Sequence, residues 1–381
     1  MLGKTASGIF WLFRYLERAE NIARLIETGH RFTLTRNSGR QDEWRSILAA
    51  LGMDAAYRAT HQDYNAAQVV DYLLRDKRNA GNLRNLIDSA RQNARTTRTA
   101  ITRELWEAVN ECWICVNDAL KRQVREADLP ATIDLIERQT AMVRGALENT
   151  MLRNDGYNFS RVGNFIERAD SMARLLDVKY YVLLPSVSFV GSSLDNIQWE
   201  TILRSTSAYS AYRWLYPGRA SALGIAEFLI LDRRFPRSLA FCYGNLTDNL
   251  RHLAMSYGAQ SASLAEAERI YASFASLTAA SILEDGLHEF LIEFLSQKHS
   301  LATLAYIGGL SAATGMVIVA TVSISTMICN DIIMPVIFHL SPLQASEDKN
   351  IGRLLLRVRR VVIVAMLLAA YGYFLLIGDG K

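Results

Sequence analysis

The sequence predicts an all-α protein: a duplicated helical bundle, followed by a C-terminal two-helix transmembrane segment. Three observations predict this fold: long proline-poor stretches of helix-forming residues, internal repetition of one motif, and an abrupt loss of charge after residue 299. The chain contains 6 prolines, and none of them precedes Pro130. Ala, Leu, Arg and Glu fill the intervals, which favours helices. No period-2 strand or Asn-Gly hairpin signal stands out.

The first 298 residues contain an internal repeat. Residues 16–26 read LERAENIARLI, and residues 166–176 read IERADSMARLL. Further along, Trp44 and Tyr57 correspond to Trp199 and Tyr212 at a similar offset. Several matches in register are unlike a chance resemblance. We therefore predict one helical domain over residues 1–298, built from repeats 1–150 and 151–298.

Each copy of the repeated motif contains a favourable intrahelical ion pair. Glu20 precedes Arg24 by four residues, and Asp170 precedes Arg174 by four. Carboxylate and guanidinium groups at this spacing lie on one helix face and stabilise the helix. We expect these four residues to form structural ion pairs.

The neighbouring Glu-Arg pairs in the motif need partners on another helix. Glu17 and Arg18 are adjacent, as are Glu167 and Arg168, and adjacent side chains point about 100° apart on a helix. In a duplicated fold the natural partners are Glu17 with Arg168 and Glu167 with Arg18, across a pseudo-twofold axis. This arrangement would be either a buried structural cluster, which the apolar stripe on the same helices favours, or a catalytic centre. In the catalytic alternative a motif glutamate is the general base and an arginine binds an anion.

At these residues the chain resembles the alpha-E family, bacterial all-helical proteins named for a Glu-Arg motif. The resemblance covers residues 1–298 and rests on RYLERAENIARLI at 14–26, NFIERADSMARLLDVKYY at 164–181, TRELWEAVNE at 102–111 and FPRSLAFC at 235–242. Two positions depart from the family pattern. Ser7 stands where the family has an acidic residue, and Asn164 stands where it has an arginine.

The resemblance implies a function through partners. Alpha-E proteins typically occur beside, or fused to, ATP-grasp-like and transglutaminase-like proteins. That context implies a helical scaffold or accessory protein that assists such a partner in forming or modifying peptide amide bonds. One alternative is an enzyme with the paired Glu-Arg motifs at its polar centre. Another is a membrane-anchored sensor component or a remnant of a transporter.

A run of arginines offers a candidate anion-binding surface. Arg84, Arg91, Arg95 and Arg98 would share one face of a continuous helix. Such a run is usually a helix face exposed to solvent. The alternative is a surface that binds an anionic ligand. No aromatic residue interleaves the arginines, which counts against stacking on single-stranded RNA, so we expect no nucleic-acid partner.

Two further patterns resemble metal sites incompletely. Cys112 and Cys115 form a CxxC within a helical run, but no second ligand pair accompanies them. Asp285 and His288 have the spacing of a helix-bundle metal ligand pair, yet the first repeat contains no equivalent histidine. We expect no metal and no cofactor.

The C-terminal segment, residues 299–381, has the composition of a membrane protein. Residues 300–330 are 31 residues without a charge, and residues 361–377 are a second uncharged run of 17. A bilayer-spanning helix needs about 20 apolar residues, so two transmembrane helices are expected. Residues 300–335 and 354–378 resemble a fragment of the sodium:solute symporter fold of symporter-type sensor kinases. The predicted location is therefore the membrane, attached through residues 300–377.

The charges around this segment conflict with its expected topology. Lys349, Arg353 and Arg357 lie between the two apolar runs, and the positive-inside rule places such a loop in the cytoplasm. That orientation would leave the helical domain outside, although we expect a cytoplasmic domain because no signal peptide precedes it. A segment taken from another membrane protein would explain this conflict. It could have been joined through a genuine gene fusion or through an artefact of gene assembly.

Overall fold

The computed structural model describes residues 1–35, 40–183, 193–218, 220–291 and 294. These residues form helices and no strand, which confirms the all-α prediction. Within them, no helix combines the length and the apolar character needed to cross a bilayer. The two predicted transmembrane helices, between residues 300 and 377, lie outside the described residues.

The helices follow one another along the chain with short connections. Their bounds are α1 Gly3–Thr35, α2 Arg40–Ala50, α3 Asp54–Arg58, α4 Ala66–Leu74, α5 Leu83–Thr96, α6 Arg103–Ala119, α7 Leu129–Thr150, α8 Asp155–Leu183, α9 Ser193–Ser205, α10 Tyr209–Leu215, α11 Ala222–Ile230, α12 Leu239–Tyr257, α13 Ala262–Ser273 and α14 Ala279–Asp285. Two 3₁₀ turns, Arg98–Ala100 and Glu126–Asp128, precede α6 and α7.

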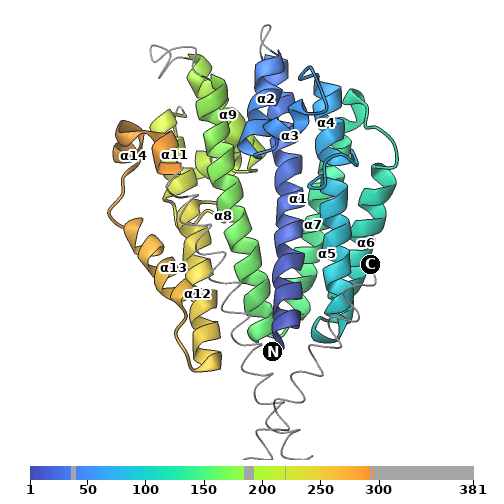
Figure 1. Ribbon diagram of the computed structural model, residues 1–381. Coiled ribbons are helices and arrows are strands. Elements are labelled where there is room, and N and C mark those ends of the chain that lie inside the picture. Colours follow the sequence, from blue (N-terminus) through green and yellow to red (C-terminus); the bar gives the residue numbers. More distant parts are fainter. Residues whose placement is uncertain (36–39, 184–192, 219, 292–293, 295–381) are drawn as a thin grey trace, which may run out of the picture. The chain divides into compact units, whose positions relative to one another are not determined.

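The two motif-bearing helices, α1 and α8, lie side by side at the centre of the bundle (Figure 1). They run parallel, because the amino group of Met1 lies 2.9 Å from Asp155 at the start of α8, and later residues of α1 meet later residues of α8. The helices approach closely at Gly163, where a Cβ atom would overlap the carbonyl group of Phe10. Parallel packing at this distance brings the two Glu-Arg motifs to the same level.

Helices α2 and α9 each end against the central helix of the other half of the chain. The Arg24 guanidinium of α1 donates to the carbonyl of Ser205, the last residue of α9, at 2.8 Å. In the same way, Arg174 of α8 donates to the carbonyl of Ala50, the last residue of α2. A helix C-terminus has unsatisfied carbonyls and a partial negative charge, and a guanidinium satisfies both. Two motif arginines therefore connect the halves of the bundle.

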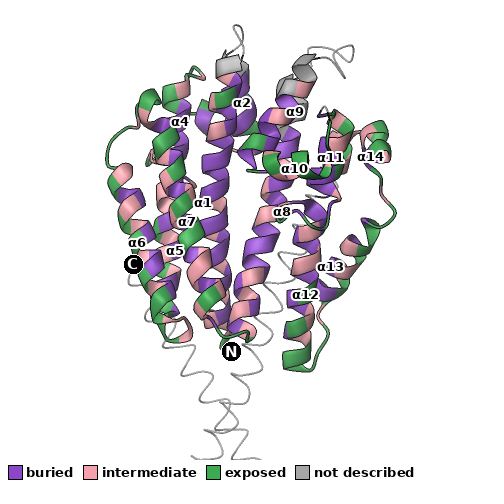
Figure 2. Ribbon diagram, turned by 180° about the vertical axis from the view of Figure 1, so that it is seen from behind, coloured by how far each residue is buried: buried purple, intermediate pink, exposed green. Residues whose placement is uncertain are grey.

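The remaining helices surround this central pair. Helices α5 and α7 pack on α1, α12 packs on α8, and α6 packs on α5 and α7. Figure 2 shows buried residues along most of α1 and α8. Trp44 and Trp199, which correspond in the predicted repeat, are both almost completely buried. The central helices thus have few solvent-facing positions, and their polar side chains must find partners inside the protein.

Candidate functional site

The two Glu-Arg motifs meet between α1 and α8 and form reciprocal ion pairs. Arg168 donates to both carboxylate oxygens of Glu17, at 2.8 Å from Nε and 2.9 Å from Nη2. Arg18 donates to both oxygens of Glu167, at 2.5 Å from Nε and 2.9 Å from Nη2. Both expected interhelical pairs are therefore present, with the two-pronged geometry that makes arginine–carboxylate bonds strong.

The intrahelical pairs are also present. Arg24 donates to Glu20 Oε1 at 2.9 and 3.0 Å, and Arg174 Nε donates to Asp170 Oδ2 at 3.0 Å. Because Arg24 and Arg174 also hold helix ends, each links its own motif to a helix of the other half. These pairs lie inside the bundle. We therefore expect them to contribute more to stability than exposed ion pairs, which contribute little.

Three further arginines complete the cluster, and sequence reasoning did not assign them to it. Arg14, one turn before the motif, donates to Glu167 Oε2 at 2.8 Å. Arg144 of α7 and Arg237, just before α12, each form ion pairs with both Glu17 and Glu20. Arg237 lies in the FPRSLAFC stretch that carried the family resemblance, so that match was the available signal.

Asn164, at the position of Arg14 in the second motif, makes a contact of a different kind. It is buried, and in the amide orientation that satisfies its neighbours its nitrogen donates to Glu17 Oε2 at 2.9 Å. Its oxygen then accepts from Arg168 Nη2 at 3.2 Å. The departure from the family pattern therefore removes a charge but keeps a hydrogen bond to the motif glutamate. Arg144 and Arg237 supply positive charge on this side instead.

The motif carboxylates are buried and held in the ionised form. Glu17 and Glu20 are 0% exposed and Glu167 is 1% exposed. Burial alone would raise the pKa of Glu17, but the charges of Arg168 and Arg237 outweigh it and hold the pKa below the usual value. Neighbouring arginines likewise lower the pKa of Glu167. They hold the pKa of Glu20 well below its usual range.

This geometry supports a structural role for the cluster more than a catalytic one. A general base needs a pKa near the working pH and a free path to the proton that it takes. The motif glutamates instead have lowered pKa values, and two-pronged arginine bonds occupy both oxygens of Glu17 and Glu167. The cavity beside them measures about 20 Å³, far below the size of a substrate pocket.

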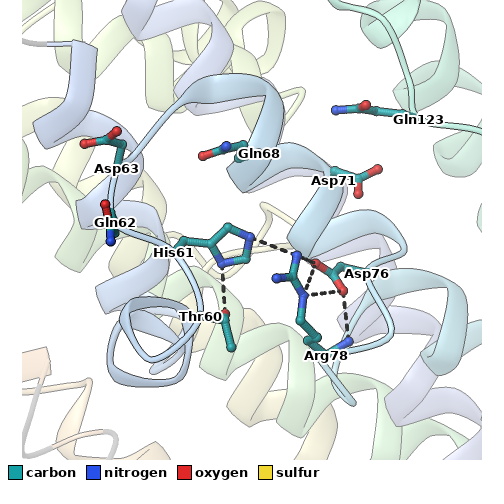
Figure 3. A pocket seen from close by; sticks show the side chains of 9 residues that line it. All are labelled: Thr60, His61, Gln62, Asp63, Gln68, Asp71, Asp76, Arg78 and Gln123. Carbon is teal, nitrogen blue, oxygen red and sulfur yellow. Dashed lines mark hydrogen bonds and ion pairs between the residues drawn. The ribbon is translucent and has the colours of Figure 1, made fainter.

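A larger polar hollow lies elsewhere, where the α3–α4 loop meets the loop after α4. It measures about 450 Å³ and contains a hydrogen-bonded chain (Figure 3). Arg78 pairs with Asp76 and contacts His61 Nε2 at 3.1 Å, so Nε2 accepts, because a guanidinium only donates. His61 Nδ1 then faces Thr60 Oγ1 at 2.9 Å. Sequence reasoning did not identify this hollow. The lining residues are Thr60, His61, Gln62, Asp63, Gln68, Asp71, Asp76, Arg78 and Gln123.

The candidate arginine face is not a continuous solvent-facing stripe. Arg84 donates to Asn117 at 2.6 Å, so it holds α5 against α6. Arg91 lies over the Trp113 ring, with its guanidinium carbon 4.2 Å from the ring centre. Helix α5 ends at Thr96, so the helical spacing that grouped Arg98 with the others does not extend that far.

Arg98, the last arginine of that run, also contacts an aromatic ring. Arg98 lies in a 3₁₀ turn over Trp106, with its guanidinium carbon 5.3 Å from the ring centre. Arg95 is exposed in the last turn of α5. Aromatic residues of α6 thus accompany two of the arginines, a contact that the linear sequence does not reveal because the rings come from another helix.

The two patterns that resembled metal sites have other surroundings. Cys112 is buried in α6, where burial raises the pKa of its thiol to about 12, and Cys115 on the same helix is a free thiol. His288 Nδ1 lies 2.6 Å from Asp177 Oδ1 of α8. Among the described residues, no group of metal-ligand side chains converges on one point.

Comparison with known proteins identifies the family. The model of the Alpha-E family, described as a predicted alpha-helical domain with a conserved ER motif, matches residues 1–305. Uncharacterised proteins of Mycobacterium bovis and Mycobacterium tuberculosis are 24% identical over 273 residues, which are 67% of this chain and 30% of theirs. The chain thus spans about a third of the length of these relatives. No solved structure matches. Since the family model covers most of the chain, including both Glu-Arg motifs, the chain belongs to the Alpha-E family.

Proposed function

We propose that this protein is a helical accessory or scaffold protein that assists an ATP-grasp-like or transglutaminase-like partner in forming or modifying peptide amide bonds. The observation that carries the proposal is the state of the Glu-Arg centre. Its carboxylates are buried, ionised and saturated with arginine bonds, which suits a structural connection between α1 and α8. In this proposal the partner catalyses the formation or modification of the amide bond.

The length of the relatives also supports an accessory role. In the mycobacterial proteins the matched region is about 30% of the polypeptide, so these helices are covalently joined to a large additional segment. The family is commonly associated with transglutaminase-like and ATP-grasp neighbours.

A membrane attachment through residues 300–377 forms the second part of this proposal. The two uncharged runs in that segment have the length of spanning helices. Alkaline carbonate extraction of membranes, followed by immunoblotting against residues 1–298, tests the attachment. A full-length band that resists extraction supports a tether, and a band that is extracted, or is shorter by the mass of the segment, contradicts it.

The accessory role is tested with a purified ATP-grasp-like protein from the same organism. ATP hydrolysis coupled to amide formation is measured for that partner alone, for this chain alone, and for the two together. We expect stimulation of the partner and no turnover by the chain alone. An absence of stimulation contradicts the proposal for that class of partner, and the same assay is then run with a transglutaminase-like neighbour.

A matched pair of variants separates scaffold from enzyme. Glu17→Asp and Glu167→Asp shorten corresponding side chains by one methylene and keep their charge. For a scaffold, stimulation of the partner should follow the folded fraction of each variant, measured by circular dichroism. If one variant stays fully folded but loses all stimulation, the motif glutamate has a direct chemical role and the enzyme alternative is correct.

A further inference from the structure

One side of the Glu-Arg cluster is a closed ion network with more positive than negative groups. Among the described residues, the carboxylates of this network form ion pairs only with its guanidinium groups, and its guanidinium groups form ion pairs only with its carboxylates. Three carboxylates face four guanidinium groups, so the formal surplus is one positive charge. The members are Glu17, Glu20, Glu137, Arg24, Arg144, Arg168 and Arg237.

Neighbouring groups do not balance this surplus. Cys242 is buried nearby, and burial raises the pKa of its thiol to about 12, so the thiol stays neutral. Thr140 donates a hydrogen bond to Glu20 and adds no charge. Burial, together with the charges of Arg24 and Arg168, lowers the pKa of Arg237 to about 10, although Glu20 and Glu17 act in the opposite direction. A buried cation under this repulsion is costly unless an anion approaches.

A small cavity is lined by three arginines of this network. It lies between α1 and α8, measures about 20 Å³, and has room for one species of the size of a water molecule or halide ion. No carboxylate belongs to its lining. The polar lining comes from Arg24, Arg168, Arg237, Asn21, Ser171 and Thr206, and the apolar lining from Leu25, Met172 and Leu175.

We infer that this cavity is a binding site for one small monovalent inorganic anion of the size of chloride. Guanidinium groups carry positive charge and only donate hydrogen bonds, so the three arginines of the lining favour a guest that accepts hydrogen bonds and carries a negative charge. The anion balances the network and stabilises the contact between the two motif helices. This inference does not depend on the identity of any partner.

Thermal unfolding of the full chain, in a mild non-ionic detergent, tests the site. Sodium gluconate is replaced stepwise by sodium chloride or bromide at constant ionic strength. An anion that binds only the folded state raises the unfolding midpoint in a saturable way, here by on the order of 2–4 °C. Sulfate at the same ionic strength should not reproduce the rise, because the cavity does not hold a polyatomic anion.

Two variants identify the site. Arg237→Gln leaves three carboxylates with three guanidinium groups, so the halide-specific rise should disappear. Arg161→Gln is the matched control. Like Arg237, Arg161 is a partly buried, ion-paired arginine, but it belongs to α8 and does not line the cavity. This control should keep the rise. Equal midpoints in gluconate and chloride for the wild-type chain, or an unchanged rise in Arg237→Gln, overturn the inference.

A direct measurement covers the case in which Arg237→Gln does not fold. Crystals of the wild-type chain grown in bromide are measured at the bromine absorption edge. An anomalous peak among Arg24, Arg168 and Arg237 supports the site. Ordinary water density there without an anomalous peak, or peaks only on the surface, overturns it.

Discussion

Replacing Glu17 by Gln removes a buried negative charge that pairs with three arginines, while the volume of the side chain is kept. Glu17 is 0% exposed and contacts the guanidinium groups of Arg168 and Arg237 at 2.8 and 3.2 Å. After the change, two carboxylates face four guanidinium groups in the closed network. Removing one partner of a buried ion pair typically costs about 3–5 kcal/mol, since the remaining charge stays buried.

That loss is a large part of the total for a domain, whose free energy of unfolding is about 5–15 kcal/mol. Urea unfolding followed by circular dichroism at 222 nm measures it on the full chain. The exposed pair of Arg103 and Glu107 offers a control: Glu107 is 57% exposed, so Glu107→Gln should change the free energy of unfolding by less than about 1 kcal/mol.

A second substitution tests the electrostatic reason. Arg168→Met in the Glu17→Gln background removes the stranded cation, so the double variant should lose less than the sum of the two single losses, by on the order of 1–3 kcal/mol. A Glu17→Gln loss below about 1 kcal/mol, or losses that simply add, would refute the view that this pair is a buried, mutually dependent unit.

Three further results are expected. The motif carboxylates have lowered pKa values in the folded state, so the unfolded chain binds protons first as the pH falls. The free energy of unfolding should therefore be highest above the usual carboxyl pKa of 4.5 and fall progressively below it, and unchanged unfolding midpoints between pH 6 and pH 3 would contradict this. Gly163→Ala should destabilise the fold by about 2 kcal/mol or more in urea unfolding, because the added methyl group overlaps the Phe10 carbonyl, and a neutral result would mean that α1 and α8 separate easily. Trp44→Ala should cost about 3–5 kcal/mol, whereas Trp214→Ala, at a residue 92% exposed, should stay within about 0.5 kcal/mol; similar losses in both would rule out this assignment of the core.

The all-α class and the partners within the motifs followed from the sequence alone. Helical periodicity is a local property, so proline-poor runs with repeated apolar spacing were sufficient to predict helices. The reciprocal pairs of Glu17 with Arg168 and of Arg18 with Glu167 followed from a second argument. Two copies of a motif with unpaired adjacent charges satisfy each other most simply when their helices meet.

Tertiary structure decided which distant residues join that centre. Arg144 and Arg237 reach Glu17 and Glu20 from segments more than 100 residues away, and their placement depends on how α7 and the start of α12 pack against α1. The linear pattern does not encode such an approach, because helix spacing orders neighbours only within about a turn.

The same limit explains contacts that the sequence pattern did not reveal. Arg84 and Arg91 share one face of α5, and each also donates a hydrogen bond to an asparagine of α6. His288 contacts Asp177 of another helix. The sequence by itself determined which faces are charged or apolar, because those are properties of one helix. Only the folded arrangement decided which charged faces are enclosed, because enclosure depends on the surfaces that pack against them.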